Sequence, residues 1–132
     1  MRLSTHFDSS EFACKCGCGR AAVAPALVAA LEQLRVKIGQ PVHITNGRRC
    51  PAHNKQVGGS PNSQHLLGCA ADISVVGRTG DDLYLAARAI PLLRGFGVAA
   101  GWIHVDVRSS GDLSRWRYDS KGRVTAWPEG SL

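Results

Sequence analysis

The spacing of apolar and polar residues along the chain predicts two long helices. Between residues 25 and 38, apolar side chains recur every three or four positions, as on the buried face of an amphipathic helix. Pro25 suits the first turn of that helix, and Gly39 suits its C-terminal end. A second helix is predicted between Thr79, whose hydroxyl can cap it, and Pro91, which stops it.

Shorter apolar stretches, several of them alternating, predict the strands. They occupy residues 42–44, 70–75, 95–98, 102–108 and 116–118. Strands and helices are mixed without strict alternation. The pattern therefore predicts an α+β fold, in which two main helices pack on a small, mainly antiparallel sheet.

The length of 132 residues suits one domain, which we expect to span residues 1–132. Residues 1–24 are expected to be irregular and to be anchored to the core by Phe7 and Phe12. We expect residues 120–132 to form a flexible tail.

A long polar segment interrupts the predicted elements at residues 46–69, which are rich in Gly, Pro, Asn and Ser. A segment of this length with little secondary structure is uncommon in a compact domain and is usually functional. Its side chains include Arg48, Arg49, His53, Asn54, Asn62, Ser63, Gln64 and His65. This mixture is too specific for a disordered linker, so the segment predicts a functional loop.

Charge and hydropathy narrow the function classes. Sixteen Lys and Arg against ten Asp and Glu give a net charge of +6, which favours polyanionic partners such as nucleic acid or an anionic cell wall. The basic residues are scattered and form no nucleic-acid-binding motif, so we expect no specific nucleic-acid partner. No apolar run reaches the roughly 18 residues of a membrane helix, which predicts no membrane insertion. The N-terminal residues lack the apolar stretch of a secretory signal, which predicts synthesis in the cytoplasm.

Five cysteines cannot all pair within one chain. Cys14, Cys16 and Cys18 are crowded together, whereas Cys50 and Cys69 stand apart. The crowded group lacks the spacer of about two residues that is usual in structural zinc sites. Reduced or singly bridged thiols in a Gly-rich turn are therefore favoured over a second metal site.

Polar residues share one face of two predicted strands. With a side-chain period of two, His104 and Asp106 lie opposite Ile103 and Val105, and Asp72 lies opposite its apolar neighbours. If the strands are close in one sheet, Asp72 and His104 project from the same face, and His65 lies seven residues before Asp72. Two imidazoles and one carboxylate suit a catalytic zinc, whose fourth position stays open. An ordinary solvated sheet face is the alternative.

Several sequence segments carry a family resemblance. They are ITNGRRCPAHN at 44–54, GGSPNSQHLLG at 58–68 with AADI at 70–73, and FGV at 96–98 with IHVDVR at 103–108. Together they resemble the zinc D-Ala-D-Ala carboxypeptidase family (M15-type), to which phage endolysins and murein endopeptidases belong. Near the N-terminus, the pairs HF and EF and the run CKCGCG resemble a phage- and prophage-associated branch of this family.

The resemblance, which runs from about residue 4 to about residue 118, implies roles for individual residues. It implies one zinc ion held by His65, Asp72 and His104. It also implies that Arg49 holds a substrate carboxylate or carbonyl and stabilises an oxyanion. Ser63 and Trp102 are further candidates for substrate contact. The alternatives are a helix cap for Ser63 and core packing for Trp102.

The chain departs from the better-known family members at the general base. They carry an acidic residue three positions before the last zinc histidine, where this chain has Gly101. Asp106, the nearest acid in sequence, is a candidate base or a residue that orients a zinc-binding imidazole, and we slightly favour the orienting role. His53 is a weaker candidate for proton transfer.

These observations predict a monomeric zinc peptidase that cuts a peptide bond in peptidoglycan stem peptides or crosslinks, as a carboxypeptidase or an endolysin-like endopeptidase. It would reach the cell wall after lysis, permeabilisation or delivery. The alternative, which Gly101 keeps open, is a catalytically weak zinc protein that binds the wall or serves as a phage structural component.

Overall fold

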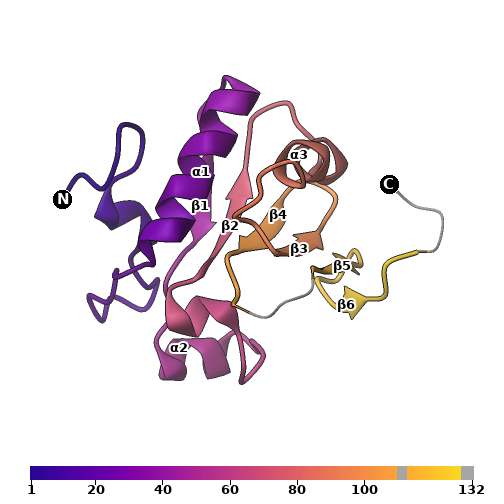
Figure 1. Cartoon of the computed structure of the whole chain (residues 1–132). Coiled ribbons are helices and arrows are strands. Elements are labelled where there is room, and N and C mark those ends of the chain that lie inside the picture. The colour runs from indigo at the N-terminus through magenta and orange to yellow at the C-terminus, as the bar shows by residue number, and fades with distance from the viewer. Residues whose placement is uncertain (110–112, 129–132) are drawn as a thin grey trace.

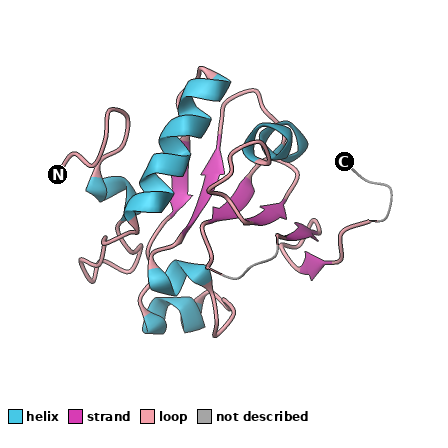
Figure 2. Ribbon diagram, viewed as in Figure 1, coloured by secondary structure: helices cyan, strands magenta, loops and turns pink. Residues whose placement is uncertain are grey.

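The computed structural model describes residues 1–109 and 113–128. In this part of the chain, six strands form one sheet in the order β1-β2-β4-β3-β5-β6, and all neighbours are antiparallel except β3 and β5 (Figures 1 and 2). The strands are β1 (His43–Asn46), β2 (Ala70–Ser74), β3 (Gly95–Val98), β4 (Ile103–Asp106), β5 (Ser114–Tyr118) and β6 (Val124–Thr125). The helices are α1 (Pro25–Ile38), α2 (Pro51–Gln56) and α3 (Gly80–Ala87), with 3₁₀ turns at Ser9–Phe12 and Gln64–Leu67.

Helices α1 and α3 enclose the hydrophobic core against one face of the sheet. Leu27, Leu31 and Leu34 of α1 are fully buried in that core. They meet the apolar positions of the strands, represented by Ile73 and Val105. The residues between these positions therefore face the other side of the sheet. The predicted α+β fold with a mainly antiparallel sheet is confirmed.

The predicted helix ends are largely confirmed. Helix α1 ends at Gly39, whose left-handed backbone (φ 74°) favours glycine. Thr79 and Asp82 form a reciprocal capping box at the start of α3, but this helix ends at Ala87, before Pro91. Within the described residues, no helix is long and apolar enough to cross a membrane.

The N-terminal segment is irregular except for its 3₁₀ turn and an isolated bridge. Phe7 and Phe12 are buried in the core, with ring centroids 6.1 Å apart, as predicted. At the other end of the chain, the structure differs from the expected tail. Strand β6 pairs with β5, and the ring of Trp127 lies 4.8 Å from that of Tyr84. Residues 129–132 of that predicted tail lie outside the described part.

The polar loop at 46–69 contains more secondary structure than its composition predicts. Pro51 occupies the first turn of α2, where it costs no hydrogen bond, and the Cys50 sulfur accepts a hydrogen bond from the backbone N–H of His53. The helix is only six residues long, and its apolar positions are too few to produce a periodic signal.

The burial of α1 makes a quantitative prediction. Leu31 is fully buried, whereas Val36 on the same helix is 72% exposed. Leu31→Ala should lower the free energy of unfolding by about 2–5 kcal/mol because it leaves a cavity. Val36→Ala should change it by no more than about 0.5 kcal/mol. Urea unfolding of both variants checks this, and equal effects would contradict the assigned core face.

Candidate active site

The pairing of β2 with β4 places Asp72 directly opposite His104. Both side chains are buried on the sheet face that lies away from α1 and α3, in agreement with the strand parity seen in the sequence. His65 reaches the same point from the 3₁₀ turn Gln64–Leu67, which contacts β2. Residues from the 3₁₀ turn, β2 and β4 therefore meet on one sheet face.

The donor atoms of these three residues converge. His65 Nε2 and His104 Nδ1 each lie 3.2 Å from Asp72 Oδ1 and 3.3 Å from each other. The other nitrogen of each ring has its own acceptor, because His65 Nδ1 donates to the Gly47 carbonyl (2.8 Å) and His104 Nε2 donates to Asp106 Oδ2 (2.7 Å). In the neutral rings, the two converging nitrogens therefore carry lone pairs rather than protons.

This arrangement fits a metal ion. Nitrogen and oxygen ligands about 2.0–2.2 Å from a tetrahedral zinc ion lie roughly 3.3–3.5 Å apart, close to the separations found here. Lone pairs that face one another repel, and a cation between them removes that repulsion. The three residues could thus hold a divalent metal, and the set leaves a coordination position for water or substrate.

The electrostatics of the centre also favour a cation. Burial would raise the pKa of Asp72, but hydrogen bonds and charge interactions with His104 and His65 outweigh it and hold the pKa well below its usual range. Burial disfavours protonation of His104, yet Asp106 and Asp72 outweigh it and raise its pKa to about 8. The carboxylates that attract a proton to His104 would equally attract a metal ion.

Asp106 lies behind His104 and is fully buried. Arg108 donates to both of its carboxylate oxygens, at 2.8 Å from Nε and 2.7 Å from Nη2. Burial opposes ionisation of Asp106, but Arg108 and His104 hold its pKa well below the usual range. Gly95, its partner across the β3–β4 ladder, has no side chain, and an added Cβ would collide with the carboxylate. Asp106 is thus held as an anion against the His104 ring.

A cleft of about 650 Å³ opens over the three converging residues. Arg49, Ser63 and Trp102, which the sequence singled out, all line it. Arg49 Nη1 donates to Asn54 Oδ1 (3.0 Å), and its Nη2 lies 3.8 Å from Asp72 Oδ2. The Ser63 hydroxyl accepts from the His65 backbone N–H (3.2 Å), so it caps the turn that presents His65.

Two further aromatic residues, Trp116 and Tyr118, line the cleft. Trp116 lies 5.2 Å from the His104 ring, and Tyr118 stacks on Trp102 with 4.9 Å between centroids. Their alternation on β5 predicts a shared face, but the sequence gives no sign that β5 pairs with β3 beside the site. Asn54 was named among the polar side chains of the loop, but its contact with Arg49 was not predicted because it depends on helix α2.

Neither Gly101, the position of the missing acid, nor His53 lines the cleft. Gly101 is exposed in the turn between β3 and β4, with open space where a side chain would begin. His53 belongs to α2 and is not among the residues that line the cleft. Within the described part of the chain, Asp72 is the one acidic residue of the cleft lining.

Comparison with known proteins agrees with this geometry. The family model described as Peptidase M15 matches residues 5–106, a span that includes all three converging residues. A search of curated proteins finds no match. Peptidases of this family depend on a metal ion, and the convergent donor set supplies a place for one. The match covers most of the chain, and the protein therefore belongs to the peptidase M15 family.

Proposed function

We propose that this protein is a zinc metallopeptidase that hydrolyses a peptide bond in peptidoglycan stem peptides or crosslinks. The observation that carries the proposal is the convergence of His65, Asp72 and His104 beneath an open cleft in an M15 chain. The net charge of +6 would favour docking on an anionic cell wall, which the protein would reach after lysis, permeabilisation or delivery.

In this proposal, His65, Asp72 and His104 hold one zinc ion. When bound, the ion would supply a Lewis acid that polarises the scissile carbonyl and acidifies an attacking water. The protein's contribution is to fix the ligands: the Gly47 carbonyl orients His65, and Asp106 orients His104.

Arg49 is the residue best placed to bind the substrate. Its side chain is 13% exposed, and its guanidinium lies between Asn54 and Asp72 at the cleft wall. A guanidinium held in this way can donate two hydrogen bonds to a carboxylate or to a developing oxyanion. The neighbouring Trp102 and Tyr118 rings would pack against the peptide. Ser63 would contribute by capping the turn that holds His65 in position.

The second candidate function is a catalytically weak zinc protein that binds the cell wall. It is favoured by one observation, that the cleft lining in the described residues has no carboxylate besides Asp72. Peptide hydrolysis needs a proton to reach the leaving nitrogen, so the absence of a second acid bears directly on activity.

One experiment separates the two functions. We expect the zinc-loaded protein to release peptide fragments from purified peptidoglycan, read by mass spectrometry, and to stop doing so with a chelator. His104→Ala should reduce release to background, whereas His43→Ala, which changes an exposed histidine of β1, should not. Full zinc occupancy without any cleavage would contradict the proposed peptidase activity and would support the wall-binding function instead.

Metal content tests the ligand set apart from activity. His65→Ala should lower bound zinc by one equivalent per chain relative to the unaltered protein, because two remaining ligands hold zinc weakly. His43→Ala again serves as control, and elemental analysis after dialysis gives the count. If His65→Ala retains the full zinc content, His65 is not a ligand.

Asp106→Asn distinguishes an orienting residue from a general base. Loss of a carboxylate behind a metal-binding histidine should weaken metal affinity about 10–100-fold, and excess zinc should restore most activity. Loss of a base would instead leave affinity intact and lower kcat about 10²–10⁴-fold. Competition with a chromophoric chelator measures affinity, with Asp81→Asn, an exposed acid on α3, as control. An unchanged zinc affinity with a lower kcat would contradict the orienting role of Asp106.

A further inference from the structure

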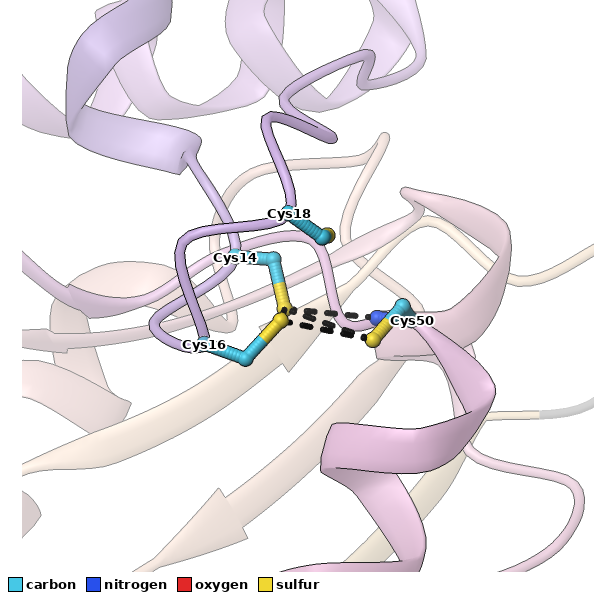
Figure 3. A group of neighbouring side chains, drawn as sticks. All are labelled: Cys14, Cys16, Cys18 and Cys50. Carbon is cyan, nitrogen blue, oxygen red and sulfur yellow. Dashed lines mark hydrogen bonds between the residues drawn. The ribbon is translucent and has the colours of Figure 1, made fainter.

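Four cysteines gather at the junction of the N-terminal segment and α2. Figure 3 shows Cys14, Cys16 and Cys18 on one turn, facing Cys50 at the start of α2. The sulfur atoms of Cys14, Cys16 and Cys50 lie 3.4, 3.6 and 3.9 Å apart, and that of Cys18 completes a group within 4.8 Å. None of the four cysteines forms a disulfide.

The spacing of the sulfurs matches a shared metal ion better than a disulfide. Sulfur ligands about 2.3 Å from a tetrahedral zinc ion lie roughly 3.7–3.8 Å apart, within the range observed here. Disulfide sulfurs lie about 2.05 Å apart. The sulfurs of Cys14, Cys16 and Cys50, at nearly equal separations, describe one face of a tetrahedron, whereas a disulfide would bring two of them closer than the third.

Backbone groups around the cluster favour thiolates. The Cys50 N–H donates to Cys14 Sγ, and the His53 N–H donates to Cys50 Sγ, both at 3.4 Å. N–H groups aimed at sulfur are the outer contacts that stabilise metal-bound thiolates.

We propose that Cys14, Cys16, Cys18 and Cys50 form a second, structural zinc site. Four thiolates select a soft, tetrahedral ion such as zinc, and they leave no coordination position for a substrate. Zinc binding would release a proton from each thiol that is not already ionised. Sequence spacing argues against the site because three of the ligands are separated by single residues, but the fourth comes from a segment 32 residues further along.

The site would tie the N-terminal segment to the active centre. Phe12 packs so closely on Gly47 that a Cβ there would lie 2.6 Å from the Phe12 Cα, and the Arg48 N–H donates to the Phe12 carbonyl (2.9 Å). The Gly47 carbonyl is the group that orients His65, and Cys50 directly follows Arg49. A zinc ion bound at Cys50 would therefore help to fix the positions of Arg49 and, through Gly47, of His65.

Cobalt(II) is the probe for this site, because thiolate–cobalt bonds give intense charge-transfer absorption in the near ultraviolet. The protein is purified with reductant, stripped of metal and titrated with cobalt in the His65→Ala background, which removes the peptidase centre. We expect one equivalent of cobalt with the thiolate band. Cys50→Ser should abolish the band, and Cys69→Ser, which changes the fifth cysteine, should leave it unchanged.

Cys18→Ser provides a second variant because its side chain is exposed, so a loss of the band cannot be attributed to a disrupted core. Absence of the thiolate band in the fully reduced His65→Ala protein would overturn the proposal. So would a disulfide within the cluster that persists under reductant, detected by mass spectrometry as the loss of two hydrogens. Because the band reports on sulfur ligands alone, its absence leaves the proposed peptidase untouched.

Discussion

Two imidazole nitrogens and one carboxylate oxygen meet within 3.3 Å of one another on the polar face of the sheet. When both rings are neutral their lone pairs repel, and burial of the carboxylate removes the water that would otherwise solvate it. A proton or a metal ion at their centre relieves both costs. Contacts from several other parts of the structure keep these three atoms together.

The restraints come from both sides of the centre. The β2–β4 register fixes Asp72 against His104, while Asp106 and Arg108 hold the far side of the His104 ring. His65 depends on a longer chain of contacts. Its ring is oriented by Gly47, and Gly47 packs on Phe12 of the N-terminal segment. The proposed cysteine zinc site lies at the end of this chain of contacts, and zinc bound there would help to hold His65 in position.

The sequence predicts those parts of the structure that follow from local periodicity. The 3.6-residue period located α1, and the two-residue period placed Asp72 and His104 on the face opposite the core. The proposed ligand set as a whole needed the family resemblance, because no local pattern predicts that His65 lies beside the strands. Features that depend on long-range contacts were missed. The approach of Cys50 to the N-terminal cysteines and the position of Trp116 beside His104 both arise from tertiary packing.

The most direct test of the metal centre is anomalous diffraction from crystals grown with zinc, recorded on both sides of the zinc absorption edge. We expect an anomalous peak between His65 Nε2, Asp72 Oδ1 and His104 Nδ1, at about 2.0–2.2 Å from each atom. A map without a peak at this position, in crystals whose cleft is open to solvent, would contradict the assignment of these three residues as a metal centre.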